Sequence, residues 1–195
     1  MGASLSVGDF NGDGISDLLI GSLQWSANTG RAYVHYGAAG SGLNAAPGGT
    51  IAGSGNPTYF TTSTSTRDMN LDGYDDILIG AHGNGTQQGK AYIFFGQVAV
   101  LGSLNTGSGG VFTISGENTT GWFGRGVAAA DVNGDGYPDM LIGAPKHNAS
   151  RGRMYITYGT ASGPTVTVAN NIANTILDGN TTPTAASEFA TTFNR

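Results

Sequence analysis

An all-β fold of stacked four-stranded sheets is predicted by three features of this 195-residue sequence. The chain contains 34 Gly and is rich in Thr, Ser and Asn, a composition typical of short strands joined by many turns. Apolar residues make up 38% of the chain and charged residues 11%, which argues against intrinsic disorder. The third feature is an internal repeat, which indicates how the sheets are arranged.

The repeat has three blocks that recur in the same order. The first block is an aspartate cluster, which reads DFNGDGISDLLIGS from Asp9, DMNLDGYDDILIGA from Asp68 and DVNGDGYPDMLIGA from Asp131. The second block reads GRAYVHYG, GKAYIFFG and GRMYITYG, starting at Gly30, Gly89 and Gly152. The third block is TIAG, TISG or TILDG. A β-sandwich would explain many short strands, but it would not explain this repeated order of motifs.

Each unit is interpreted as four short strands. The first precedes the aspartate cluster, as at 123–130, the second and third lie at 139–143 and 153–158, and the fourth corresponds to 111–115. Runs such as LLIG and YIFF are typical of strands in sheets that are covered on both faces. One four-stranded unit cannot bury two faces alone, so neighbouring units are expected to stack radially as the blades of a β-propeller.

The expected architecture is therefore a partial β-propeller of four-stranded antiparallel blades, with three blades and one extra first strand. The three blades are expected at residues 1–53, 54–116 and 117–179. Residues 180–195 are expected to form a linker and the first strand of an incomplete fourth blade, because Phe189 opens a segment like those at Phe60 and Phe123.

The aspartate cluster follows the pattern D-x-N-x-D-G-x-x-D. Oxygen-bearing side chains at positions 1, 3, 5 and 9 of a tightly curled loop can face one centre, and Gly at position 6 allows the sharp turn. Position 7 can add its backbone carbonyl. Hard oxygen ligands without nearby Cys or His favour Ca²⁺, so the sequence predicts three calcium ions per chain. The predicted ligands are Asp9, Asn11, Asp13, Ile15 and Asp17; Asp68, Asn70, Asp72, Tyr74 and Asp76; and Asp131, Asn133, Asp135, Tyr137 and Asp139.

These loops differ from the helical EF-hand, which shares positions 1, 3, 5 and 6 but needs a bidentate Glu at position 12. Position 12 is Ile20, Ile79 or Ile142 in this chain, inside an apolar strand.

The segment WFGRGVAAADVNGDGYPDMLIGAP at 122–145 resembles an FG-GAP repeat, the repeat of integrin α-subunit head domains. Phe123-Gly124 corresponds to FG and Gly143-Ala144-Pro145 to GAP. The other units depart from this pattern: the second has Phe60-Thr61 for FG, and the first two end in Gly21-Ser22 and Gly80-Ala81-His82. The resemblance implies calcium loops on one face of a propeller. It also implies partners on the opposite face, at the loops between strands 2 and 3 and between strand 4 and the next strand 1.

Four residues outside the loops have alternative interpretations. Phe123 and Trp122 are interpreted as residues that pack between blades rather than residues that line a sugar-binding pocket, although Trp122 lies at the start of a loop. His82 and His147 are interpreted as loop histidines without a metal or catalytic role.

Several function classes are disfavoured by the sequence. The net charge of −5 argues against nucleic acid as the main partner. No apolar run is long enough to insert in a membrane, and no signal peptide is recognisable at the N-terminus. The GxSxG, HExxH and GKS/T motifs do not occur, and the chain is not expected to be an enzyme.

The sequence thus favours an extracellular or cell-surface calcium-binding module for adhesion or protein–protein interaction, because extracellular calcium modules bind at about 10⁻⁴ to 10⁻³ M. One alternative is a self-assembling subunit or propeller fragment that forms a ring or a fibre. Others are a carbohydrate-binding, lectin-like propeller and an accessory domain of a larger secreted enzyme. The expected partners are other copies of the chain, further blades, or a protein or glycan on the face opposite the calcium loops.

Overall fold

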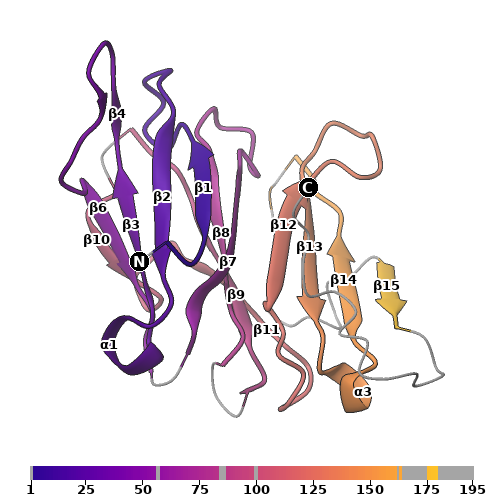
Figure 1. The fold of residues 1–195 in the computed structure, drawn as a ribbon. Coiled ribbons are helices and arrows are strands. Elements are labelled where there is room, and N and C mark those ends of the chain that lie inside the picture. The colour runs from indigo at the N-terminus through magenta and orange to yellow at the C-terminus, as the bar shows by residue number, and fades with distance from the viewer. Residues whose placement is uncertain are drawn as a thin grey trace.

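The computed structural model describes residues 2–55, 58–83, 87–98, 101–161, 163 and 175–179. The described strands form three large sheets that stand side by side like blades, and one small hairpin (Figure 1). This arrangement confirms the expected partial propeller. The predicted fourth-blade strand at 180–195 lies outside the described residues. No helix in the described part of the chain is long and apolar enough to cross a membrane.

The first blade consists of antiparallel neighbours in the order β1-β2-β3-β6. Its strands are β1 (Leu5–Gly8), β2 (Asp17–Ser22), β3 (Arg31–His35) and β6 (Gly49–Ala52). The short turn α1 (Trp25–Asn28) joins β2 to β3, and the hairpin of β4 (Gly37–Ala38) and β5 (Gly42–Leu43) separates β3 from β6.

The second and third blades repeat this order, each strand pairing antiparallel with the next. The second blade contains β7 (Phe60–Arg67), β8 (Asp76–Ala81), β9 (Lys90–Phe94) and β11 (Phe112–Ser115). The third contains β12 (Gly126–Ala130), β13 (Asp139–Ala144), β14 (Arg153–Thr157) and β15 (Thr175–Asp178), with the turn α3 (His147–Ser150) between β13 and β14. The four strand positions expected within a unit are thus confirmed.

The second blade is buried on both faces. Every residue of β8 is buried, and successive strand side chains point to opposite faces. Ile77 and Ile79 therefore join a core cluster with the first blade, and Leu78 joins a second cluster with the third blade. The near-continuous apolar runs of the repeat are explained by this two-sided packing.

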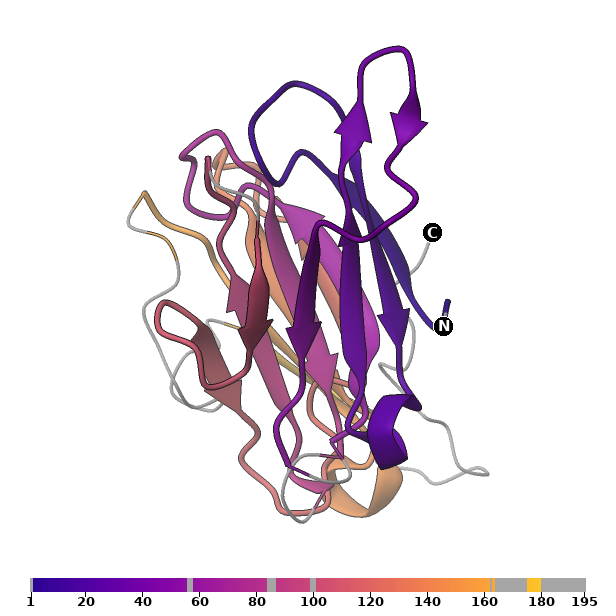
Figure 2. The same cartoon turned by 90° about the vertical axis from the view of Figure 1, so that its left-hand side faces the viewer.

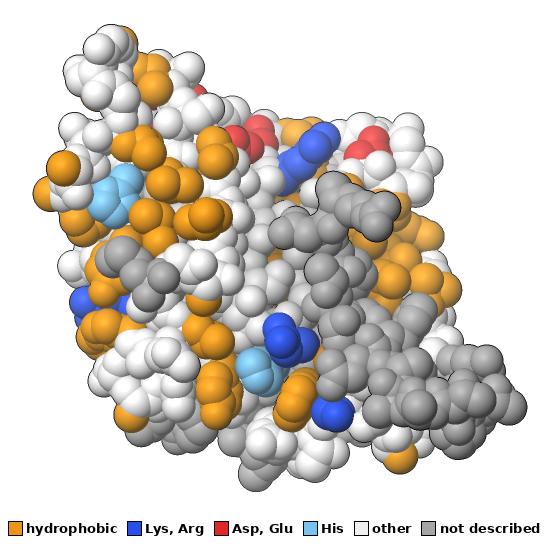
Figure 3. All heavy atoms as spheres, viewed as in Figure 1, with side chains coloured by type: hydrophobic (Ala, Val, Ile, Leu, Met, Phe, Trp, Pro, Cys, Tyr) orange, Lys and Arg blue, Asp and Glu red, His pale blue; other side chains and the backbone are white. Residues whose placement is uncertain are grey.

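The first blade is covered on one face only. Leu19 on β2 is fully buried against the second blade, whereas Leu18 and Ile20 on the other face are half-buried. Leu5 and Val7 pair with Ile20 and Leu18 across β1 and β2, and they are 61% and 59% exposed. Hydrophobic side chains accordingly gather over the first blade in Figure 3.

One strand was not foreseen from the sequence. The connection from β9 to β11 contains β10 (Ser103–Asn105), which pairs parallel with β6 and so adds a fifth strand to the first blade. Leu104 on β10 packs against the core between the first two blades. Leu101, just before β10, is buried, and its N–H donates to the hydroxyl of Tyr36 (2.5 Å). The second blade therefore holds the first through backbone pairing as well as side-chain packing.

The inner strands of neighbouring blades are joined by small polar side chains. Ser63 and Ser65 on β7 accept hydrogen bonds from the N–H groups of Val127 and Ala129 on β12 (3.2 and 3.0 Å). On the other side, the Thr66 hydroxyl donates to the carbonyl of Val7 (2.6 Å). The Ser- and Thr-rich sequence of β7 thus connects all three blades.

Candidate metal loops and the opposite edge

The three aspartate loops lie at one edge of the blades, and α1 and α3 lie at the opposite edge (Figures 1 and 2). Each loop connects the first and second strands of its blade. The Gly at position 6 has a positive φ in every copy, with φ of +81° at Gly14, +91° at Gly73 and +89° at Gly136. A side chain at these residues would be strained, which explains the requirement for Gly at the turn.

The side chain at position 1 organises the loop. Asp9 accepts hydrogen bonds from the N–H groups of Gly12 (2.7 Å), Asp13 (3.1 Å) and Gly14 (2.8 Å). Asp131 accepts equivalent bonds from Gly134 (2.7 Å) and Gly136 (2.9 Å). In the second loop, the carboxylate of position 1 bonds to the N–H groups at positions 5 and 6.

Positions 3 and 5 form a side-chain pair in all copies. The Asn11 amide donates to the Asp13 carboxylate at 3.0 Å, and the Asp13 carboxylate also accepts from the N–H of Ile15 at 2.8 Å. The same two bonds recur among the equivalent residues, which are Asn70, Asp72 and Tyr74, and Asn133, Asp135 and Tyr137. Three oxygen-bearing side chains per loop, at positions 1, 3 and 5, are thus folded onto one short turn.

Position 9 has a different environment. Asp17, Asp76 and Asp139 are 1%, 0% and 0% exposed at the starts of their second strands. Each carboxylate accepts one N–H from position 2 of its loop and one from a glycine after the third strand. For Asp139 these donors are Val132 and Gly159, both at 2.8 Å. The position-9 aspartate therefore clamps the loop to the blade.

These buried carboxyl groups lie close to other acids. Burial, helped by the charges of Asp72 and Asp68, raises the pKa of Asp76 to about 7, although the hydrogen bonds from Gly96 and Met69 lower it. Burial likewise raises the pKa of Asp17. At position 1, by contrast, hydrogen bonds led by that from Gly136 lower the pKa of Asp131.

The donor chemistry of each loop fits a hard cation, because every candidate side chain presents oxygen and none presents sulfur or imidazole. Within the described residues, no three His, Cys, Asp or Glu side chains converge on a single metal-binding point. The position-9 oxygens face backbone amides, and each Asn amide donates to its neighbouring Asp. Calcium binding by the fifteen residues named above therefore remains a prediction.

Asp75, next to the second loop, contacts the loop of the first blade. It is half-buried, and its carboxylate accepts the N–H of Asp9 at 2.9 Å. The N–H of Asp75 in turn donates to the carbonyl of Asp9 at 2.9 Å. Asp75 thus joins the loop of the second blade to that of the first.

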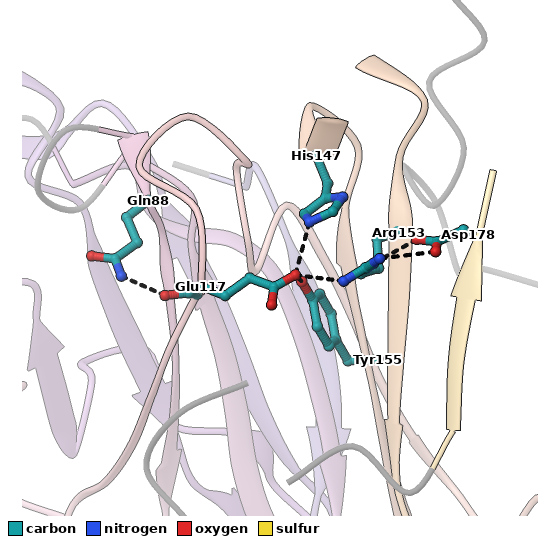
Figure 4. Close-up of polar contacts among 7 residues, drawn as sticks. Gln88, Glu117, His147, Arg153, Tyr155 and Asp178 are labelled. Carbon is teal, nitrogen blue, oxygen red and sulfur yellow. Dashed lines mark hydrogen bonds and ion pairs between the residues drawn. The ribbon is translucent and has the colours of Figure 1, made fainter. Parts of the chain in front are cut away.

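A second polar cluster lies toward the opposite edge, between the second and third blades (Figure 4). Glu117 follows β11, and one of its carboxylate oxygens accepts from Tyr155 (2.6 Å), Arg153 (2.6 Å) and His147 (2.8 Å). Burial opposes ionisation of Glu117, but these three partners together hold its pKa below the usual value. The cluster ties the connection between the two blades to the third blade.

Arg153 extends this cluster to the outer strand of the third blade. Its guanidinium also donates to both carboxylate oxygens of Asp178 (2.5 and 2.8 Å). In the sheet register, Asp178 stands opposite Arg153, where Ala52 stands opposite Arg31 in the first blade. Planar two-point pairing of this kind is the strong form of an arginine–carboxylate contact.

Sequence reasoning missed both Glu117 and Asp178. The one available signal was the extra residue in TILDG compared with TIAG and TISG, which supplies Asp178. His147 had been interpreted as a loop histidine; it is 7% exposed and bonded to Glu117. Phe123 is 1% exposed in the core between the second and third blades, as expected, whereas Trp122 is only half-buried.

Comparison with known proteins agrees with this geometry. The FG-GAP repeat model matches residues 1–35, 60–94 and 123–156, which together exceed half of the chain. Integrin alpha pat-2 of Caenorhabditis elegans is 32% identical over 178 residues, covering 84% of this chain and 14% of that protein. Integrin alpha-V of Gallus gallus is 31% identical over 185 residues, covering 92% of this chain and 17% of that protein.

A relative of another kind is the phosphatidylinositol-glycan-specific phospholipase D of Bos taurus, which is 31% identical over 159 residues. That match covers 74% of this chain and 18% of the phospholipase. The chain thus spans less than a fifth of the length of each of these three relatives. From the matched repeats, the shared blade architecture and these relatives, the chain belongs to the FG-GAP repeat family.

Proposed function

We propose that the chain is a calcium-stabilised binding module of an extracellular protein, in which calcium is structural and the opposite edge of the blades contacts a partner. The observation that carries this proposal is the repetition of one oxygen-rich loop at the same edge of all three blades. A single Asx-rich turn needs no metal to explain it. Three turns with equivalent hydrogen bonds, each next to a buried aspartate, favour a common ligand.

The charge of the chain supports a cation at these loops. Nine of its thirteen acidic residues lie at positions 1, 5 and 9 of the loops, where like charges repel unless a cation is present. Three Ca²⁺ would change the formal net charge from −5 to +1. The side chains at positions 1, 3, 5 and 9 would hold the ion with the position-7 carbonyl, and the ion would supply charge neutralisation and cross-linking.

Calorimetric titration of the calcium-stripped chain tests this proposal. The expected stoichiometry is near three Ca²⁺ per chain, and melting in EDTA is expected well below melting in calcium. A stoichiometry of one or zero, or the same midpoint in both conditions, would overturn the structural role of calcium. Titration with Mg²⁺ is the matched control, because Mg²⁺ requires a stricter octahedron and is expected to bind more weakly.

The binding part of the proposal rests on the loops at the other edge. The integrin relatives are consistent with adhesion or protein–protein contact there, and millimolar extracellular calcium suits loops of moderate affinity. The phospholipase D relative raises an enzymatic alternative. We infer binding rather than catalysis. The Glu117 oxygen that contacts His147 also accepts hydrogen bonds from Tyr155 and Arg153, and this cluster joins neighbouring blades.

A second candidate role is assembly through the uncovered face of the first blade. Leu5 and Val7 are exposed there, whereas the second blade is covered on both sides. Further propeller blades or another copy of the chain would bury this face, and a closed three-bladed monomer is not expected because propellers close with about 4–8 blades.

Light scattering at micromolar concentration tests the assembly. The chain is expected to exceed its monomer mass of 19.7 kDa, and the double substitution Leu5→Thr with Val7→Thr is expected to reduce association. Leu43→Thr is the matched control, since Leu43 is 46% exposed but lies on the β4–β5 hairpin. A stable wild-type monomer would exclude the assembly.

A further inference from the structure

A pocket of about 510 Å³ opens among residues of all three blades at the edge opposite the aspartate loops. Ala3 and Leu23 of the first blade line it, with Tyr59, His82 and Trp122 from the neighbouring loops. Its volume is in the range of small-molecule sites. In Figure 3, a histidine flanked by hydrophobic and basic side chains lies in the lower middle of the face shown.

Three rings form the apolar wall of this pocket. Tyr59 and His82 stack with centroids 4.9 Å apart, and Trp122 lies 5.3 Å from His82. The Trp122 indole N–H donates to Gln87 at 3.1 Å, so the ring is held in place. Rigid ring faces of this kind pack against flat, partly apolar ligands.

The backbone is strained where two of these rings are attached. Tyr59 has φ of +50° and Trp122 has φ of +57°, both left-handed values that are unfavourable for aromatic residues. The two residues occupy the same position, immediately before the buried Phe60 and Phe123. Such strain concentrates at ligand sites, where the surrounding structure maintains it.

The hydrogen bonds of His82 define its polar role. The Thr62 hydroxyl donates its single proton to the carbonyl of Tyr59 (2.6 Å), so its 2.7 Å contact with His82 Nδ1 is donated by the imidazole. Nε2 of His82 is therefore an acceptor. Burial, which has the larger effect, and the charge of Arg125 together lower the pKa of His82 to about 4, so the ring is neutral at physiological pH.

Arg125 is the positively charged group among the described residues that line the pocket. It comes from the turn before β12, and among the described residues no acidic side chain forms an ion pair with it. The part of the lining that the structure describes contains no Asp or Glu. A half-buried guanidinium in this setting favours a carboxylate, which it can bind at two points.

We propose that this pocket binds a carboxylated sugar residue, with the carboxylate on Arg125, a ring hydroxyl donating to His82 Nε2, and the sugar ring against Tyr59 and Trp122. The volume exceeds what a single acidic amino-acid side chain needs, and the aromatic wall suits the C–H face of a pyranose. The inference rests on the proposed function, since it names the ligand class of the edge assigned there to partner binding.

Fluorescence titration with glucuronic acid tests the proposal, and glucose, which carries a hydroxymethyl group in place of the carboxylate, is the comparison sugar. The measurement uses the full chain in calcium with Trp25→Phe, so that Trp122 is the one remaining tryptophan. Glucuronic acid is expected to bind at least tenfold more tightly than glucose, a difference of about 1.4 kcal/mol. Arg125→Gln is expected to remove that preference, and Arg151→Gln, an exposed arginine outside the pocket at the same edge, is expected to retain it.

Equal binding of the two sugars, or binding of neither, would overturn the proposal. Binding of an aspartate-containing tripeptide that depends on Arg125, without binding of glucuronic acid, would also overturn it by identifying a peptide site. Calcium stoichiometry is measured on the same samples. Three bound Ca²⁺ without sugar binding would refute the sugar site alone, whereas loss of calcium binding would refute the proposed function.

Discussion

Gly89 touches the backbone of Phe123 across the second and third blades. A Cβ added at Gly89 would stand 2.0 Å from the Phe123 carbonyl oxygen, and the two residues form a parallel β-bridge. Gly30 has the same relationship to Phe60, at 2.2 Å. In the first two repeats, the glycine that opens the second block therefore lets the next blade approach.

Gly89→Ala is expected to destabilise the chain by about 3 kcal/mol, because it adds a clash with fixed backbone to the strain of a positive φ. Urea denaturation in calcium measures the change. Gly109→Ala is the control: nothing lies within 4 Å of an added Cβ at Gly109, so an effect within about 0.5 kcal/mol is expected. Equal effects of the two substitutions would contradict the close-approach explanation.

Thr61→Gly is expected to stabilise the chain by about 1 kcal/mol. Thr61 occupies the glycine position of the FG pair with φ of +72°, it is fully buried, and its hydroxyl has no hydrogen-bond partner. Relief of left-handed strain and of a buried unsatisfied hydroxyl outweighs the lost methyl packing and the freer unfolded chain. Thermal melting measures the shift, and a lower midpoint would show that packing dominates.

Asp135→Ala is expected to reduce calcium stoichiometry from three to two. In EDTA the substitution removes the turn bonds to Asn133 and Tyr137, which contribute about 1 kcal/mol, and it also relieves repulsion between Asp135 and the other carboxylates of the loop. In calcium at 100 times Kd, it also removes ligand stabilisation of about 2.7 kcal/mol. Comparison of urea midpoints in the two buffers separates these effects. Equal losses would indicate that Asp135 holds no ion.

Acid pH is expected to destabilise the chain through His82. The folded-state pKa of His82 is about 4, below the unfolded value of about 6.5, so unfolding is coupled to proton uptake. The neutral ring contributes its full stability above pH 6.5, and this is lost as pH falls toward 4, by up to about 1.4 kcal/mol per unit of pKa difference. The stability difference between wild type and His82→Gln is therefore expected to change across this range, and parallel pH profiles would contradict the assignment.

The repeat was sufficient to predict the blades and the location of the aspartate loops. The strand order follows from the recurring blocks. Because successive side chains of a strand point to opposite faces, Ile77 and Leu78 pack against different neighbouring blades. Contacts that occur in one unit only were harder to predict from the sequence. The position of Glu117 is occupied by Ser54 in the first unit, so the repeat does not predict this acid. The short parallel β10 has no periodic pattern, because it is stabilised by edge pairing with β6 rather than by burial of one of its faces. The left-handed Thr61 and Trp122 are held by contacts with the preceding blade, to Ser4 and Gln87, and could not be inferred locally.

The pairing of β10 with β6 also has a mechanical consequence. The hydrogen bonds from Thr50 to Gly102 (3.0 Å) and from Thr106 to Ala52 (3.1 Å) link segments separated by the inner three strands of the second blade. A force that pulls the first blade away from the second must break these backbone hydrogen bonds. It must also expose the apolar surface that is buried between the two blades. The first two blades therefore resist extension as one unit, whereas no such strand among the described residues joins the second blade to the third.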